Sequence, residues 1–172
     1  MFHLSTRSLG RLEGVHPDMA ETVKIAITLT KIDFGVTCGL RTVKEQERLV
    51  ATGRSQTMNS KHIPQADGFS HAVDLVAYDG PSPVWELNMY DDICDAMAEG
   101  ARRVGCKIEW GAAWSEGSIT DYPTTAEDAM NAYIDLRRSQ KRRPFLDGPH
   151  FQLLTSPQTH PCLLYTSDAA DE

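Results

Sequence analysis

The chain has 172 residues, of which 41% are hydrophobic and 24% charged, and its formal net charge is −7. These values predict one globular domain with a single core, and the acidic balance argues against nucleic-acid binding. No apolar run approaches the roughly 18 residues that cross a bilayer, so no membrane insertion is expected. Four cysteines without a CxxC pair argue against a zinc ribbon or a disulfide scaffold, and Cys38, Cys94 and Cys106 are expected to be buried thiols.

The first elements expected are a helix over 15–32 and a strand over 34–42. Pro17 suits the first helical position, and Asp18 suits the positive end of the helix dipole. In the stretch FGVTCGLRT, apolar and polar residues alternate, which is typical of a strand with one face in the core. This phase places Arg41 on the outward face of the strand.

A short helix and a second strand follow. Thr42 and Glu45 match the T-x-x-E capping box, which predicts a helix that continues to about Val50. After a polar loop, HAVDLVAY predicts a strand over 71–78, and DGPSP over 79–83 predicts a turn.

The second half of the chain mixes helices and strands. Apolar residues at helical spacing predict a helix from about Trp85, with Gly105 placed to end it. CKIEWG over 106–111 and PHFQLL over 149–154 predict short strands, separated by an excursion over 115–143 that has its own helix. Without regular βαβ alternation, this order indicates an α+β fold, a central antiparallel sheet flanked by helices.

We interpret residues 1–161 as one domain. Read back into DNA, the terminal CLLYTSDAADE over 162–172 fits a transposon-end adapter used to prepare sequencing libraries, so we treat it as non-native. The N-terminus lacks the apolar region of a signal peptide, which predicts a protein made in the cytoplasm.

The stretch SKHIPQADGFSHAVDL holds two histidines and an aspartate that suit a metal. In a strand that starts at His71, that side chain faces away from Asp74, whereas His62 can reach Asp74 from the loop. On the last strand, His150 points opposite Phe151, and Asp147 precedes it across a tight turn. The residues alone leave open whether these side chains are ligands or ordinary strand and turn residues.

Several ordered blocks carry a family resemblance: VHPDM, DFGVTCGLRTVKEQERLVATG, QTMNSKH, SHAVDL, IEWGAAW and DGPHFQL. Together they resemble the M15 metallopeptidases, most of all the phage endolysins that cut peptidoglycan stem peptides between L-alanine and D-glutamate. The resemblance runs from about Val15 to Leu153. It implies the fold of the D-alanyl-D-alanine peptidases and the hedgehog signalling domain.

The resemblance also implies roles. His62, Asp74 and His150 match the three Zn²⁺ ligands, Asp147 matches the acid/base residue, and Arg41 matches the arginine that steadies the substrate carbonyl or its oxyanion. A three-ligand zinc lowers the pKa of its water to about 7, and a positioned carboxyl group typically contributes about 10²–10⁴-fold to catalysis. The alternatives without a catalytic role are an ordinary turn residue for Asp147 and a surface ion pair for Arg41.

The chain departs from the family pattern in three places. The first two ligands are usually spaced H-x-x-G-x-A-x-D, but here PQADGF lengthens the segment. Ala113 in WGAAW replaces an acidic residue of the usual WGGDW. If that acid supports a ligand, its loss would lower metal affinity about 10–100-fold. The excursion over 115–143 is an insertion relative to the short phage enzymes.

We therefore predict a zinc peptidase that acts on the bacterial peptidoglycan stem peptide as a phage or prophage endolysin. It is expected to be a monomer that stays in the host cytoplasm until it is released to the cell wall. One alternative is a D-Ala-D-Ala carboxypeptidase or dipeptidase of the same superfamily. The other is a non-catalytic wall-binding module that keeps zinc only for structure.

Overall fold

The computed structural model describes residues 1–154, so the segment 162–172 predicted to be non-native lies outside the described residues. None of the described helices is long and apolar enough to cross a membrane. The helices and strands in chain order are α1 (Thr6–Arg11), α2 (Pro17–Leu29), β1 (Asp33–Cys38), α3 (Val43–Ala51), β2 (Ala72–Asp79), β3 (Ser82–Val84), α4 (Met89–Val104), β4 (Ile108–Trp110), the 3₁₀-helix η1 (Ile119–Asp121), α5 (Ala126–Ser139) and β5 (His150–Leu153).

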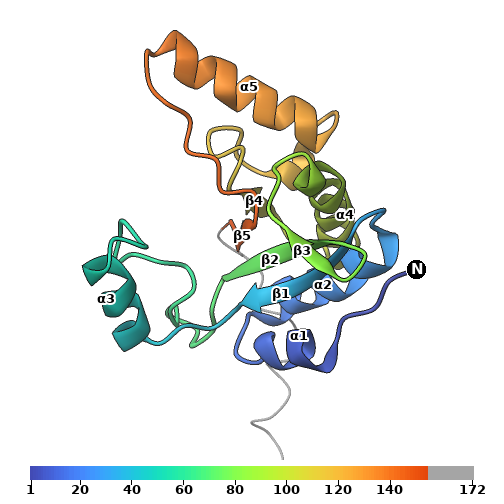
Figure 1. The fold of residues 1–172 in the computed structure, drawn as a ribbon, viewed down its shortest axis with the longest axis vertical. Helices are drawn as coiled ribbons and strands as arrows, with labels where there is room; N and C mark the ends of the chain where they lie inside the picture. The colour runs from blue at the N-terminus through green and yellow to red at the C-terminus, as the bar shows by residue number, and fades with distance from the viewer. Residues whose placement is uncertain (155–172) are drawn as a thin grey trace, which may run out of the picture.

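The strands form one antiparallel sheet in the order β1-β2-β5-β4, and β3 pairs with β2 beside this path. Helices lie around the sheet, with α3 near the β1 end and α5 near the β4 end (Figure 1). The predicted α+β class with a central antiparallel sheet is confirmed.

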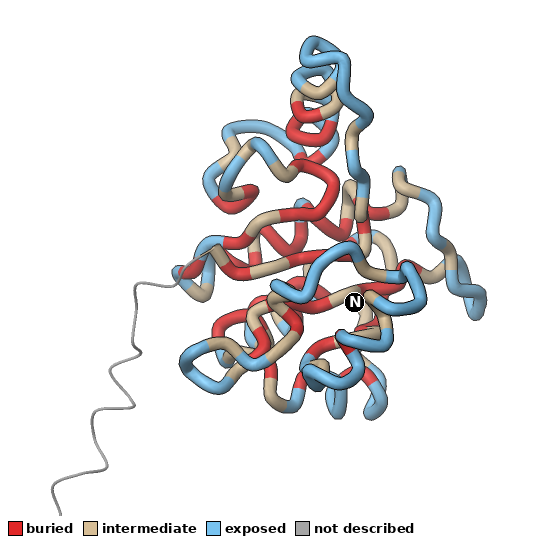
Figure 2. Tube along the Cα trace, turned by 90° about the vertical axis from the view of Figure 1, so that its left-hand side faces the viewer, coloured by how far each residue is buried: buried red, intermediate tan, exposed pale blue. Residues whose placement is uncertain are grey.

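The core lies between one face of the sheet and the pair α2 and α4. Val73 and Leu75 of β2 and Phe151 of β5 point into it, and each of these side chains is nearly or fully buried. Figure 2 shows buried residues concentrated in the centre of the molecule and exposed residues at its projecting ends. Because side chains alternate along a strand, the residues between these apolar ones face the other side of the sheet.

Three local signals read from the sequence are confirmed. Pro17 begins α2, and Thr42 with Glu45 forms a complete capping box at the start of α3. Gly105 ends α4 with a left-handed φ of 86°, a conformation that costs glycine little.

Four features of the fold differ from the expectation. Strand β1 ends at Cys38 rather than at residue 42, because its pairing with β2 becomes irregular after Val36. Residues 82–84 form an edge strand instead of a turn, where Pro83 needs no outer partner. Helix α4 begins at Met89, since the exposed Trp85 gives no core contact to extend it.

The fourth difference is α1, a short polar helix that the apolar pattern did not predict. Ser5 caps it by accepting a hydrogen bond from Ser8 N, and it lies against β1. Arg11 at its end donates to Val36 O at 2.7 Å. A six-residue helix without apolar periodicity depends on such tertiary contacts for its stability.

Candidate active site

One face of the sheet carries a row of three polar side chains on neighbouring strands. Asp74 of β2 lies opposite His150 of β5 on one side and opposite Cys38 of β1 on the other. Side chains directly opposite each other in an antiparallel pair share a face, with Cβ atoms about 4.5–5.5 Å apart. The register therefore brings together Asp74 and His150, two of the residues that the sequence predicts as metal ligands.

His62 reaches the same face from the segment between α3 and β2. The carbonyl of the preceding Lys61 accepts a hydrogen bond from His71 N at 2.8 Å, which closes the base of the long loop over 63–70. His62 Nε2 then lies 3.1 Å from Asp74 Oδ1. The lengthened spacing between the first two predicted ligands therefore does not separate them in space.

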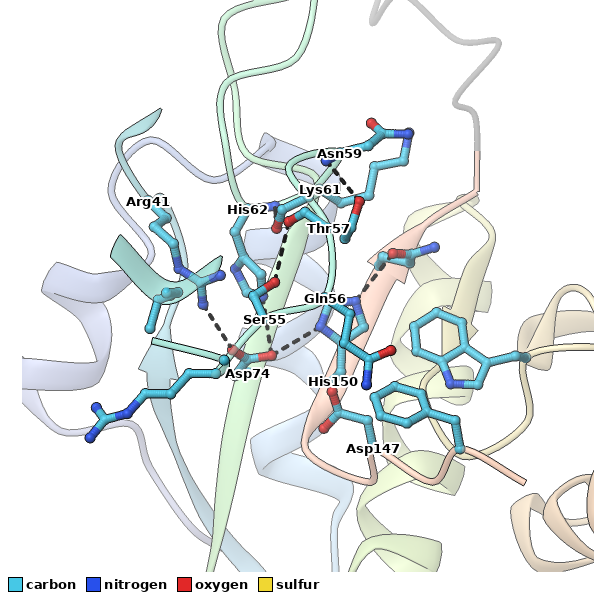
Figure 3. A pocket seen from close by; sticks show the side chains of 17 residues that line it. Arg41, Ser55, Gln56, Thr57, Asn59, Lys61, His62, Asp74, Asp147 and His150 are labelled. Carbon is cyan, nitrogen blue, oxygen red and sulfur yellow. Dashed lines mark hydrogen bonds and ion pairs between the residues drawn. The ribbon is translucent and has the colours of Figure 1, made fainter. Parts of the chain in front are cut away.

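The hydrogen bond on the far side of the His62 ring fixes where its proton sits. Nδ1 lies 2.8 Å from Gly39 O, and a carbonyl oxygen only accepts, so Nδ1 carries the proton and donates. In the neutral ring, Nε2 then presents a lone pair to the carboxylate of Asp74 (Figure 3). Two electron-pair donors would then face each other, so this contact needs positive charge, supplied either by a proton on Nε2 or by a metal ion between the two side chains.

A side-chain relay fixes His150 in the same way. Gln152 Nε2 donates to Glu109 Oε2 at 2.7 Å, which leaves Gln152 Oε1 to accept from His150 Nε2 at 3.1 Å. The lone pair of a neutral His150 is therefore on Nδ1, which lies 3.0 Å from the same Asp74 Oδ1. Such partners orient the histidine ligands of metal sites.

The pKa shifts of His62 and Asp74 also indicate that this site favours positive charge beside the carboxylate. Burial alone would lower the pKa of His62, but hydrogen bonds to Asp74 and Cys38 raise it to about 10. Burial alone would raise the pKa of Asp74, yet hydrogen bonds from His150 and His62 hold it well below its usual range. The donor set of two imidazoles and one carboxylate suits a divalent metal, and zinc in particular.

Cys38 offers a second possible donor set, since ligand atoms of Cys38, His62 and Asp74 all lie within 4.8 Å of one another. Its Sγ, however, is 3.7 Å from His62 Nδ1, the nitrogen that donates to Gly39 O, and it accepts from Arg41 at 3.4 Å. Cys38 thus lies beside the protonated edge of the ring. His150 Nδ1, which faces Asp74 Oδ1, fits a ligand position better than the Cys38 thiol. The half-buried Cys38 differs from the fully buried thiol expected.

Arg41 lies beyond the end of β1, so its expected place on the strand is wrong. Its guanidinium is 3.6 Å from Asp74 Oδ2 and donates to Gln46 Oε1 at 2.7 Å. Gln46 is fully buried and also donates to Ser55 Oγ and Thr57 O. Arg41 is therefore held beside Asp74. Sequence reasoning missed Gln46, although a polar residue on the inner side of a short helix was a signal that could have found it.

Asp147 lies in the turn before β5 and is joined to the end of β4 by backbone bonds. Asp147 N donates to Gly111 O at 2.9 Å, and Gly111 N donates to His150 O at 2.8 Å. A Cβ on Gly111 would meet Asp147 O, so only glycine allows this approach. Burial and the negative charge of Asp74 raise the pKa of the Asp147 carboxyl, and the nearby His150 lowers it by less.

His71 is placed away from this centre. Its Nε2 lies 2.7 Å from Asp67 Oδ2, and His16 Nε2 lies 3.8 Å from the same oxygen. These three residues could also surround a metal. His16 Nδ1, however, accepts from Asp18 N, so a neutral His16 keeps its proton on Nε2 and cannot ligate there. We interpret the cluster of His16, Asp67 and His71 as a set of polar contacts that holds the 63–70 loop against the start of α2.

A cleft of about 980 Å³ opens over the site face and is lined by His62, Asp74, Asp147 and His150. Its size is within the range of small-molecule and peptide sites. Sequence reasoning missed several other lining residues. They are Arg54, Lys61, Trp114, Phe145 and Gln152.

Comparisons with known proteins show which proteins the chain is similar to. The model of the family "Phage L-alanyl-D-glutamate peptidase" matches residues 1–154. The L-alanyl-D-glutamate peptidase of Escherichia phage T5 is 26% identical over 118 residues, which are 66% of this chain and 82% of that protein.

Among solved structures, the L-Ala D-Glu endopeptidase ChiX of Serratia marcescens is 32% identical with a TM-score of 0.62, and the match covers 87% of each chain. The vancomycin-resistance D,D-dipeptidase VanXYg is 14% identical with a TM-score of 0.40, over 83% of this chain and 51% of that one. The family match over all described residues and the likeness to ChiX show that this chain belongs to the phage L-alanyl-D-glutamate peptidase family.

Proposed function

We propose that this protein is a zinc-dependent peptidoglycan hydrolase that cuts the stem peptide between L-alanine and D-glutamate. The family match and the names of the phage T5 and Serratia relatives support the bond that is cut. One observation carries the metal: the lone pairs of His62 and His150 converge on Asp74 Oδ1, at 3.1 and 3.0 Å. These three residues would hold the zinc.

The chain's own residues supply the proton transfers and the charge. Zinc, when bound, would polarise the scissile carbonyl and lower the pKa of a water molecule. Asp147 would accept a proton from the attacking water and deliver it to the leaving amine, and its raised pKa favours this exchange. Arg41, held by Asp74 and Gln46, would stabilise the negative charge that develops on the carbonyl oxygen.

We also propose that the protein acts as an endolysin. The match to a phage peptidase family supports this role. In this proposal the protein would be a monomer, made in the host cytoplasm and later released to the wall. In this proposal residues 1–161 form a single catalytic domain. The adapter-like segment 162–172 contributes nothing to activity.

The test is digestion of purified peptidoglycan by the full chain, with and without a chelator, with products identified by mass spectrometry. We expect chelator-sensitive fragments that carry a new free D-glutamate amine, and restoration of their formation by added zinc. Loss of the terminal D-alanine alone would instead support a carboxypeptidase. Intact stem peptides would refute the proposal and favour a binding module.

Two variants test the ligand assignment. His150→Ala should lose bound zinc and activity together, because it removes one of three ligands. His71→Ala is the matched control: it removes an imidazole on the segment that leads into β2 but outside the cleft, and it should keep one zinc per chain. Equal zinc loss in both variants would refute the assignment of His150.

A further inference from the structure

The cleft has two chemically different ends, on opposite sides of the candidate ligands. Asp74 and His150 lie on the two middle strands of the order β1-β2-β5-β4. Arg41 follows the edge strand β1, and Trp114 follows the edge strand β4. A substrate that lies across the strands would therefore meet a cationic end and an aromatic end, with the reacting bond between them.

The cationic end contains Arg41 and Arg54, both of which line the cleft. Arg54 lies next to Ser55, which Gln46 ties to Arg41 through hydrogen bonds of 2.8 and 2.7 Å. Arg41 is already held by Asp74, whereas Arg54 is exposed at the rim. Arg54 is thus the guanidinium at this end that can turn toward a substrate carboxylate, a partner that matches its fork of donors.

The aromatic end is a stacked pair, Trp114 and Phe145, which flank the 115–143 excursion on its two sides. The ring centroids of Trp114 and Phe145 are 6.3 Å apart with an interplanar angle of 22°, and Trp114 lies 5.5 Å from the ring of His150. Phe145 is 54% exposed, although its backbone N donates to the hydroxyl of Tyr133 on α5. An exposed aromatic ring held in place beside a cleft is a platform for an apolar surface.

The bond between L-alanine and D-glutamate separates two halves of matching chemistry. On the glutamate side the peptide continues through the γ-carboxyl group, which leaves the α-carboxylate free. On the alanine side a single residue leads to the lactyl group of N-acetylmuramic acid, a neutral sugar with apolar C–H faces. One extended residue spans about 3.5 Å, so the sugar would fall a short distance beyond His150, on the scale of the Trp114 contact.

We propose that the cleft orients the substrate by these two ends: the muramoyl sugar stacks on Trp114 and Phe145, and Arg54 binds the α-carboxylate of D-glutamate. This inference rests on the proposed function and adds a sugar subsite and a direction of binding to it. It also gives the 115–143 excursion a role, since Phe145 follows the excursion and is held by Tyr133 within it.

Four small substrates separate the two contacts: MurNAc-L-Ala-D-Glu, MurNAc-L-Ala-D-isoglutamine, and the same two dipeptides without the sugar. D-isoglutamine differs from D-glutamate only in having an amide in place of the α-carboxylate. The measurement is kcat/KM for each substrate with the zinc-loaded full chain. Two ratios follow, the advantage conferred by the sugar and the advantage conferred by the carboxylate.

The wild type should prefer the sugar-bearing substrates, and Phe145→Ala should cut that advantage about 3- to 10-fold, the usual strength of an aromatic contact. Arg54→Gln should cut the carboxylate advantage about 2- to 5-fold, more at low than at high salt. Two neighbours outside the cleft serve as matched controls: Leu146→Ala and Arg48→Gln should leave both ratios unchanged.

The inference is overturned if Phe145→Ala leaves the sugar advantage intact, if it lowers both ratios equally, or if the wild type shows no sugar advantage. A wild type that cleaves none of the four and also leaves peptidoglycan stem peptides intact refutes the proposed function instead. Whenever none of the four is cleaved, the subsite is judged by calorimetric binding of the same ligands. Tighter binding of the sugar-bearing ligands to the wild type but not to Phe145→Ala supports it, and equal binding overturns it.

Discussion

Replacing Gln152 by leucine should weaken zinc binding without removing any ligand. In the wild type, Gln152 Oε1 accepts the proton of His150 Nε2 at 3.1 Å, and Glu109 fixes the orientation of the amide. With zinc on Nδ1, this proton must remain on Nε2, where it would face an apolar side chain. In the metal-free variant the proton can move to Nδ1 and donate to Asp74, so only the zinc-bound state is penalised.

The size of the effect follows from burial. His150 is only 9% exposed, so water replaces the lost acceptor poorly. A buried donor left without a partner costs about 1–3 kcal/mol. With about 1.4 kcal/mol for each factor of ten in affinity, this predicts a loss of about 5- to 150-fold. Loss of an outer partner of a metal ligand typically costs 10–100-fold, in the same range.

The assay is competition for zinc between the protein and a chromophoric chelator, at pH 7.5. Glu109→Gln is the matched control, because its amide oxygen can still accept from Gln152, and it should lose less affinity than Gln152→Leu. Circular dichroism of the metal-free proteins checks that all variants are folded. A folded Gln152→Leu variant that binds zinc as tightly as the wild type would refute the relay to His150.

Four further predictions follow from the site and its surroundings. Asp147→Asn should lower kcat by at least about 100-fold at unchanged zinc content, because it removes the proton carrier; near-normal turnover would contradict that role. Cys38→Ser should retain one zinc per chain by elemental analysis, whereas loss of the metal would make Cys38 a ligand. Zinc affinity should rise about tenfold per pH unit between pH 6 and 8, because zinc must displace the proton of His62, whose pKa is about 10 without metal; calorimetry in buffers of different ionisation enthalpy should count about one proton released. Burial and neighbouring carboxylates raise the pKa of Asp91 to about 6. The folded state therefore holds the Asp91 proton more tightly than the unfolded chain does. The free energy of unfolding of the protein should fall as the pH rises from about 4 to 6. Asp91→Asn should raise stability at pH 7 by about 1 kcal/mol, less than the full shift because the side chain is partly solvated, and an unchanged melting temperature would contradict this.

The sequence predicted the parts of the site that depend on local patterns. Alternation along β2 correctly separated Asp74 from Val73 and Leu75 on the core face, and the same phase put His150 opposite Phe151. Capping signals placed α3 correctly because a cap depends only on residues three positions apart.

Contacts between distant segments could not be read in this way. The relay from His150 through Gln152 to Glu109 depends on the register between β5 and β4, which no single strand encodes. The thiol of Cys38 was expected to be buried because free cysteines usually are. The sequence did not show that Cys38 of β1 lies opposite the polar Asp74 of β2. Arg41 was placed on a strand because alternation continued in the sequence after the hydrogen-bonded ladder had ended.

The closed base of the 63–70 loop has a consequence for how relatives of this protein are recognised. Because Lys61 O and His71 N are bonded, the distance between His62 and Asp74 in space does not depend on the number of residues between them. Insertions can accumulate at the tip of such a loop while the ligands stay in place. A search pattern with a fixed ligand spacing would therefore overlook functional members of the family, and this loop is a suitable position for grafting a wall-binding peptide onto the enzyme.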